Sequence, residues 1–316
     1  MKQGEPQSLL VVGSVAFDDI EMPDGQRRKR LLGGSATHFA MAASPMARTR
    51  LVAVVGKDFT ANDLHTLTSH NIDVTGLEQD KSGMTFHWSG RYAENLDSRK
   101  SLETNLNVFE KFRPVLPDGW ERSSIVFLGN IDPTLQLDVL QQMRDPVLVA
   151  MDTMDHWING ARRDDVLNVI SKVQVLFVSK EEGRAITGKR RIVEIGPALI
   201  QYGPKLVVVK DAEHGAHLFS RMEKEIDHFF TAAYPLENVI DPTGAGDSFA
   251  GGFLGYLARN AEQMSPGTLR RAMHIGSIMA SFCVEGFGIE RTMHVTLRQI
   301  EERHRSFLKH TSINID

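Results

Sequence analysis

The sequence predicts an α/β fold in which a mostly parallel sheet is covered by helices on both faces. Two observations support this. First, short runs of Val, Ile and Leu recur along the 316 residues, and their continuous hydrophobicity is typical of strands buried on both faces. Second, helical patterns lie between most of these runs, so successive strands need crossover connections. The composition, 41% hydrophobic and 24% charged, is that of an ordinary globular protein with a sizeable core.

The expected strands follow the chain at residues 8–17, 50–56, 124–130, 146–152, 173–179 and 205–210. The helices expected between them span residues 34–46, 58–70, 134–145 and 161–173. From residue 246 onward the chain is expected to be mostly helical. Ser265 followed by Pro266 opens one of these helices, and Thr296 with Gln299 forms a capping box for the last.

Two segments do not fit the parallel pattern. Residues 82–113 alternate polar with aromatic side chains and carry many charges, which favours a small antiparallel excursion from the main sheet. Residues 18–34 contain a Pro-Asp-Gly turn between two short runs that can pair as a hairpin. We therefore expect one domain over residues 1–316, with a β lid inserted from about 18–32 and 82–113.

Charge and composition exclude several classes of function. A net charge of −4 and a pI near 6.3 give no reason to expect nucleic acid or an anionic membrane as partner. The basic runs at 27–30 and 188–191 are predicted to be solvated loops or strand edges. No apolar run approaches the ~20 residues that span a bilayer, and the single cysteine, Cys283, is predicted to be a packing residue in a helix. We expect a cytoplasmic protein with a small-molecule ligand.

Candidate ligand-binding residues lie where strands end. In open α/β sheets ligands bind beyond the carboxyl ends of the strands, so glycines and acids at these points are the candidates. Asp18 follows the first strand, and Gly33 with Gly34 precedes a helix start rich in small residues, where backbone amides can approach a ligand closely. Asp152 and Glu182 follow two later strands. Taken singly, each of these acids is expected to be structural.

The stretch DPTGAGDSFAGGF, residues 241–253, is more specific. Its Gly244, Ala245 and Gly246 permit a turn whose N–H groups converge where a helix begins, and the positive end of that helix adds to an anion hole. Asp247 lies on the first turn, where a carboxylate can take a proton from an alcohol that attacks a phosphoryl group. In the alternative interpretation, Asp247 only stabilises the first turn of the helix and the glycines only allow close helix packing. This explains the acid or the glycines but gives no reason for the whole set together.

This stretch is neither a Walker loop nor a dinucleotide fingerprint. It resembles the C-terminal signature of the ribokinase-like (PfkB) family of sugar and nucleoside kinases. Residues 33–40, GGSATHFA, resemble the family's Gly-Gly signature, and the order of the remaining pieces agrees over nearly the whole chain. The resemblance implies a ribokinase-like three-layer α/β/α sandwich with a small antiparallel β lid. It also implies ATP and Mg²⁺ as cofactors, and it leaves activation by K⁺ open.

The resemblance assigns roles to individual residues. It implies that Asp247 is the catalytic base and that the anion hole is formed by Gly244, Ala245 and Gly246. The residues that would contact the acceptor are Asp18, Gly33, Gly34 and His38. Those that would hold the nucleotide are Ser179, Glu182, Lys210, Glu213, Gly215, Gly244, Gly246 and His274. Glu182 would also organise magnesium through water, and Asp241 and Thr243 match positions that hold a monovalent cation.

The chain departs from the family pattern at four positions. Ser179 replaces the Asn of the N-x-x-E element, and Ala212 stands where a glycine is usual in the nucleotide turn. On the acceptor side, Ala16 and His38 each stand where Asn is usual. The last two departures make ribose a doubtful substrate.

The preferred interpretation is an ATP-dependent kinase that phosphorylates a hydroxymethyl group of a sugar. A nucleoside kinase is the alternative, because the lid aromatics Phe86, Trp88 and Tyr92 can stack on a base. A sensor without catalytic activity on the same fold is a third hypothesis, but Asp247 and the Gly-Ala-Gly turn argue against it, since a binding protein needs no base there. The exposed edges of a lid sheet also make a homodimer through the lid plausible.

Overall fold

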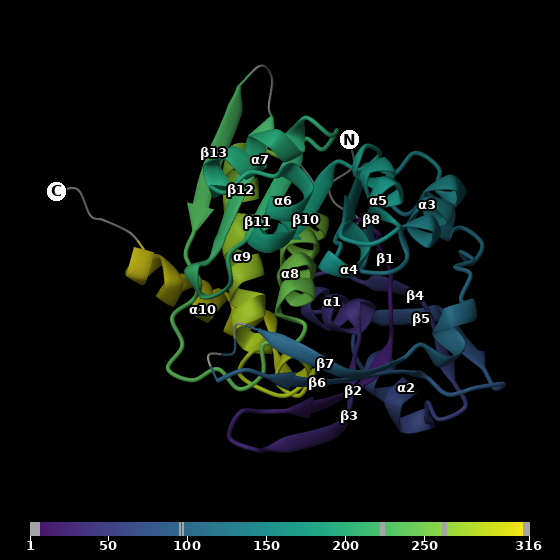
Figure 1. Ribbon diagram of the computed structural model, residues 1–316. Coiled ribbons are helices and arrows are strands. Elements are labelled where there is room, and N and C mark those ends of the chain that lie inside the picture. The colour runs from purple at the N-terminus through teal and green to yellow at the C-terminus, as the bar shows by residue number, and fades with distance from the viewer. Residues whose placement is uncertain (1–6, 95, 97, 222–224, 261–263, 312–316) are drawn as a thin grey trace.

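The computed structural model describes residues 7–94, 96, 98–221, 225–260 and 264–311. Its main sheet has nine strands in the order β13-β12-β11-β10-β9-β8-β1-β4-β5, and a second sheet has the order β3-β2-β6-β7 (Figure 1). The neighbours from β11 to β5 pair in parallel, whereas β11, β12 and β13 pair antiparallel. The predicted α/β fold with a mostly parallel sheet is confirmed.

The strands of the main sheet are β1 (Leu9–Val12), β4 (Thr49–Gly56), β5 (Ile72–Asp80), β8 (Ile125–Leu128), β9 (Leu148–Met151), β10 (Val175–Ser179), β11 (Leu206–Lys210), β12 (Ala216–Arg221) and β13 (Ile226–Thr231). Those of the small sheet are β2 (Ala16–Glu21), β3 (Arg27–Gly33), β6 (Phe86–Tyr92) and β7 (Arg99–Asn105).

The helices are α1 (Ser35–Ala43), α2 (Ala61–Thr68), α3 (Pro133–Gln142), α4 (Asp155–Ile158), α5 (Arg163–Ile170), α6 (Lys180–Thr187), α7 (Ile192–Ile200), α8 (Ala245–Arg259), α9 (Pro266–Cys283) and α10 (Leu297–Thr311). Short 3-10 helices span Asn107–Lys111, Trp120–Arg122, Ala212–His214 and Thr292–His294. The predicted caps are present: Ser265 accepts from the Thr268 amide, and Gln299 accepts from the Thr296 amide.

Two hydrophobic cores lie on opposite faces of the main sheet. Leu9 and Val11 of β1 pack into the core under α1, α8 and α9, whereas Leu10 and Val12 pack into the core under α3, α5, α6 and α7. Successive residues of a strand point to opposite faces, so a strand that contributes to both cores must be apolar throughout. This explains why the central strands read as continuous apolar runs.

The small sheet lies at the lower end of the molecule in the view of Figure 1. Its two antiparallel pairs, β2 with β3 and β6 with β7, are joined by a parallel pairing of β2 with β6. An apolar cluster of Ile20, Met22, Tyr92 and Phe287 joins this sheet to the loop after α9.

The expected strand over residues 8–17 is wrong in one respect, because it is divided between the two sheets. The chain ends β1 at Val12 and enters β2 at Ala16. Between them, Gly13 lies so close to α1 that a Cβ atom there would be 2.7 Å from Oγ of Ser35, and the Ser14 amide donates to the same oxygen at 3.1 Å. This contact with the start of α1 redirects the chain from the main sheet into the small one.

Candidate active site

The start of α8 is built from close contacts that only glycine permits. Gly244 is the N-cap, with φ of 76°, in the left-handed region that favours glycine. A Cβ atom there would lie 2.3 Å from the ring of His38, and one at Gly246 would lie 2.9 Å from Nζ of Lys210. The first turn of α8 is therefore held between α1 and the end of β11, with its free amides at the carboxyl end of the sheet.

Asp247 lies on this first turn and is partly buried. Burial, followed by the negative charge of Asp152, raises its pKa to about 7, while Lys210 and Arg99 act in the opposite direction. At neutral pH the carboxyl group is therefore divided between its two protonation states. A group in this condition can both accept and return a proton.

A lysine and two acids meet at the carboxyl ends of neighbouring strands. Lys210 ends β11 and donates from Nζ to Oδ2 of Asp152, beyond the end of β9, at 2.5 Å. Glu182 lies in the first turn of α6, and burial and the charge of Asp152 raise its pKa to about 7, against the effect of Lys210. Asp152, weighed as structural from the sequence, thus belongs to the same cluster as Lys210 and Glu182.

Ser179 and Glu182 form a capping box at the start of α6. Oγ of Ser179 accepts from the Glu182 amide at 3.1 Å, and Oε2 of Glu182 accepts from the Ser179 amide at 2.6 Å. The serine that replaces the usual Asn therefore caps the helix and orients the Glu182 carboxylate.

The cluster fits a hydrated divalent cation and phosphate groups. Asp152, Glu182 and Asp247 bring three carboxyl groups near one ammonium group. Burial, followed by the charge of Asp152, raises the pKa of both Glu182 and Asp247, so a cation bound beside them would stabilise their ionised forms. Within the described part of the chain, no group of three or more His, Cys, Asp or Glu has the arrangement of a direct metal site. A magnesium ion here would keep much of its water shell, as this ion commonly does.

Asp18 lies on β2, facing the main domain, and is 5% exposed. Burial, followed by the charge of Asp241, raises its pKa to about 7, while Arg99 opposes the shift. A Cβ atom at Gly33 would be 2.1 Å from Oδ2 of Asp18, and one at Gly34, with φ of 90°, would be 2.5 Å from the Ser14 carbonyl oxygen. The two glycines thus give Asp18 its room and admit the tight entry into α1.

His38 is buried beneath the turn at Gly244. Burial lowers its pKa to about 4, so the imidazole is neutral. Its Nδ1 lies 3.8 Å from Sγ of Cys283, and its Nε2 has no hydrogen-bond partner among the described residues. Cys283 is itself buried, its pKa is raised by burial to about 12, and its Sγ donates to the Thr243 carbonyl at 3.3 Å. These properties agree with a packing role for the cysteine.

Asp241 and Thr243 lie in the loop before α8. Oδ1 of Asp241 accepts from the Thr243 amide at 2.9 Å, and Oδ2 accepts from the Gly288 amide at 3.2 Å. The Thr243 hydroxyl lies 2.7 Å from the Tyr92 hydroxyl of the small sheet. The Asp241 carboxylate therefore holds two backbone segments together, whether or not a cation binds there.

The residues expected to surround the nucleotide do not cluster as the acids and Lys210 do. Glu213 is exposed and pairs with His214 at 3.1 Å, so the structure does not bring it to the acids of the site. Gly215 approaches β13 so closely that a Cβ atom would be 2.1 Å from the Thr231 carbonyl oxygen. Ala212, where glycine is usual, has φ of 47°, a strained value for alanine. His274 of α9 is partly buried, with its ring 5.8 Å from that of Phe229.

Arg99 is a site residue that sequence reasoning missed. It begins β7, and its guanidinium lies 5.2 Å from the ring of Trp88. Although Arg99 as a whole is exposed, its guanidinium is partly shielded from water, which lowers its pKa; the Tyr92 hydroxyl and the carboxyl groups of Asp18 and Asp247 outweigh this and raise it. In sequence, an arginine in a charged and exposed strand carries no signal that separates it from its neighbours.

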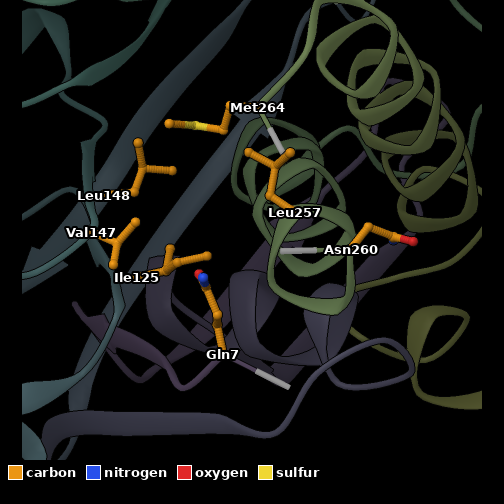
Figure 2. A pocket seen from close by; sticks show the side chains of 7 residues that line it. All are labelled: Gln7, Ile125, Val147, Leu148, Leu257, Asn260 and Met264. Carbon is orange, nitrogen blue, oxygen red and sulfur yellow. The ribbon is translucent and has the colours of Figure 1, made fainter. Parts of the chain in front are cut away.

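The described surface also has a small apolar pocket of about 40 Å³ at the other end of the sheet. Figure 2 shows Ile125 and Leu148, the first residues of β8 and β9, pointing toward Leu257 near the end of α8. The acids and Lys210 lie at the opposite, carboxyl ends of the strands. This pocket is therefore separate from the candidate active site.

The sequence profile described as pfkB family carbohydrate kinase matches residues 6–294. The cytidine kinase of Thermococcus kodakarensis is 30% identical over 256 residues, covering 79% of this chain and 88% of that protein. The nucleoside kinase of Methanothermobacter thermautotrophicus is 27% identical and covers 90% of this chain and 92% of its own. The ATP-dependent 6-phosphofructokinase of Thermoanaerobacterium thermosaccharolyticum is 26% identical, with 87% of each chain covered.

Solved structures share the fold. The Burkholderia thailandensis nucleoside kinase in complex with inosine has a TM-score of 0.76 at 17% identity, covering 95% of this chain and 99% of its own. An E. coli protein described as ribokinase II, in complex with ATP and Mg²⁺, has a TM-score of 0.78 at 16% identity, with coverage of 95% and 99%.

No helix among the described residues combines the length and apolarity needed to cross a bilayer.

Proposed function

Because the chain belongs to the pfkB family of carbohydrate kinases, and is thus a phosphotransferase with an alcohol acceptor, we propose that it transfers the γ-phosphoryl group of ATP to the 5′-hydroxyl of a nucleoside. The observation that carries the proposal is a pair of acids, the buried Asp18 of the small sheet and the partly buried Asp247 of α8, with the charge of Arg99 lowering the pKa of both. The two relatives that act on nucleosides favour this acceptor over the simple sugar preferred from the sequence.

Asp247 is the proposed general base. It takes the proton of the acceptor hydroxyl as that oxygen attacks, and its pKa near 7 suits a base that works at neutral pH. The amides at Gly244, Ala245 and Gly246 begin α8 beside it, where they stabilise negative charge that develops on the transferred oxygens.

On the nucleotide side, ATP bound with Mg²⁺ supplies the phosphoryl group. Lys210 reaches the first turn of α8 and would contact the phosphates, while Asp152 and Glu182 would hold a hydrated magnesium ion. Gly215 and His274 are proposed to border the rest of the nucleotide. Glu213 is a weaker candidate because its side chain is exposed. A monovalent cation at Asp241 and Thr243, with K⁺ as activator, remains a prediction.

On the acceptor side, Asp18 accepts hydrogen bonds from ribose hydroxyls, and the small sheet serves as the lid. Asp18 and Trp88 are paired in the parallel register of β2 and β6, so their side chains share one face of that sheet. Phe86 stacks on Phe109, with ring centroids 5.4 Å apart, and the Tyr92 hydroxyl contacts the loop before α8. Of the three lid aromatics, Trp88 is therefore the one we propose for contact with the base.

His38 is proposed to contact the acceptor from below, because its buried Nε2 has no partner among the described residues and an acceptor hydroxyl would provide one. This imidazole is neutral, so it can offer a hydrogen bond without adding charge beside the N-cap of α8.

The experiment is an acceptor panel with ATP and Mg²⁺ in a coupled ADP assay. Cytidine, inosine and adenosine are compared with ribose, fructose and fructose 6-phosphate by their kcat/KM values. We expect at least one nucleoside to exceed every sugar by about tenfold or more, because a site built to bind polar groups of the base discriminates against acceptors that lack them. Turnover of a sugar without turnover of any nucleoside would overturn the proposal.

A further inference from the structure

Tyr92 makes a polar contact between the small sheet and the loop that begins the anion hole. It is the last residue of β6 and is 5% exposed. Its hydroxyl lies 2.7 Å from Oγ1 of Thr243, a buried contact between residues 151 positions apart in the chain. Because Gly244 follows directly, the contact lies one residue before the N-cap of α8.

Two further hydrogen bonds hold the backbone of Thr243. Its amide donates to Asp241, and its carbonyl accepts from Cys283 of α9. Asp241 in turn accepts from the Gly288 amide. A displacement of Thr243 would therefore move Gly244, which has little freedom because its backbone lies against the ring of His38.

Apart from the Tyr92–Thr243 contact, the small sheet meets the segment after α9 mainly through apolar side chains. Phe287 joins Ile20, Met22 and Tyr92 in one buried cluster, and the guanidinium of Arg28 lies 5.2 Å from the Phe287 ring. Apolar contact favours docking but is not directional, whereas a hydrogen bond of 2.7 Å between two buried hydroxyls defines a position.

We infer that Tyr92 is a positioning residue that completes the anion hole when the small sheet closes over the acceptor. Its hydroxyl fixes Thr243, and through Thr243 the amides of Gly244 to Gly246, relative to Asp247. Transfer is thereby tied to the closed state, which keeps water from serving as the acceptor. The inference rests on the proposed function, since it concerns the same site.

The test uses Tyr92→Phe, which keeps the ring in its apolar cluster and removes only the hydroxyl. The loss of one hydrogen bond is expected to lower kcat/KM for the acceptor about 5- to 10-fold. The dissociation constant of ATP should stay within twofold, and amide hydrogen exchange in residues 241–248 should accelerate with both ligands bound. Tyr202→Phe, at a tyrosine that is 37% exposed, is the matched control and should behave as the parent.

A double-mutant cycle separates positioning from general loosening. Thr243→Val removes the other partner, so the double variant should lose no more than the worse single variant. Additive losses, parent-like kinetics in Tyr92→Phe, or equal acceleration of exchange in α9 would each overturn the inference. All measurements use whichever acceptor the parent protein phosphorylates. If the parent phosphorylated only sugars, the nucleoside proposal would be refuted. The double-mutant cycle, run with the sugar acceptor, would still test the role of Tyr92.

Discussion

Asp18 and Asp247 share the main cause of their raised pKa values but differ in the second. Burial is the largest cause for both, followed by Asp241 for Asp18 and by Asp152 for Asp247. Arg99 opposes the shift in both cases, and it comes from the small sheet rather than from the main domain. The protonation of the proposed base therefore depends on a residue that moves with the proposed lid.

Arg99→Gln is expected to raise the pKa of Asp247 further, because a positive charge that lowers it is removed. The acid limb of the pH profile of kcat/KM should move to higher pH, and kcat/KM at pH 7 should fall at least about tenfold, since a donor for developing charge is also lost. Arg91→Gln is the matched control, because Arg91 pairs with Glu21 at 2.9 Å away from the acids of the site. An unchanged profile in Arg99→Gln would contradict this role.

At this scale the sequence could predict residues whose type and local spacing carry the chemistry. Asp247 follows a Gly-Ala-Gly turn, so its local pattern is informative, whereas Glu182 was singled out by the resemblance to the family's N-x-x-E element. Asp152 and Arg99 are different, because their importance comes from what lies beside them in space. The exposure of Glu213 shows the reverse case, in which a position chosen by resemblance points to solvent.

At the scale of elements, α8 shows why the residues after Asp247 are small. A Cβ atom at Gly251 would lie 2.4 Å from the Phe39 carbonyl oxygen of α1, and one at Gly252 would lie 2.9 Å from the Ile275 carbonyl oxygen of α9. The helix therefore contacts backbone on two sides. Close packing of α8 against α1 keeps the proposed base next to the helix that carries Gly34 and His38.

Gly251→Ala is expected to lower the free energy of unfolding by about 1–3 kcal/mol, because the added methyl group meets backbone that cannot move away cheaply. Urea denaturation measures this loss, and kcat should fall with it. Gly267→Ala in α9 is the control, because its nearest neighbour would be a side-chain oxygen at 3.8 Å. That change should be neutral or stabilise by about 0.5–1 kcal/mol. Equal stability of the two variants would contradict the packing argument.

Elements with strong periodicity were predictable, and those set by long-range contact were not. The buried strands β4, β8, β9, β10 and β11 and the helices α1, α8 and α9 follow from their apolar patterns. The edge hairpin of β12 and β13 was missed because its outer strand carries exposed polar residues. The parallel pairing of β2 with β6 also has no local signal, because it joins residues far apart in the chain, such as Ala16 with Phe86.

At the scale of the whole molecule, two sets of groups give stability opposite dependences on pH. Buried histidines have depressed pKa values, about 4 for His38 and for His304, so the folded state loses stability as pH falls below the unfolded value near 6.5. Asp18, Glu182 and Asp247 have pKa values raised to about 7, so their contribution is fully present below the unfolded values near 4 and is lost as pH rises from there through 7.

Three acids outweigh two histidines, so these groups should make the free energy of unfolding fall from pH 5 to about 7 and level off toward pH 8. Urea denaturation at a series of pH values in fixed ionic strength measures it. Mg²⁺ with ATP should flatten the fall between pH 5 and 7, because a bound cation compensates the ionised acids and stabilises the folded state by binding. A stability that increases steadily from pH 5 to 7 would contradict the assignment of these acids.

Assembly of two copies through the edges of the small sheet remains a prediction. The outer strands β3 and β7 are largely exposed, and β3 carries the basic run at 27–30, which discourages pairing in register between like edges.

The central claim is that Asp247 takes the proton of the acceptor hydroxyl, and Asp247→Asn with the preferred acceptor tests it most directly. The amide keeps the shape and hydrogen-bonding capacity of the side chain but cannot act as the base. We expect kcat to fall at least ~100-fold, while the dissociation constant of ATP, measured by calorimetry, changes less than about threefold. Turnover of this variant at the parent rate would contradict the account.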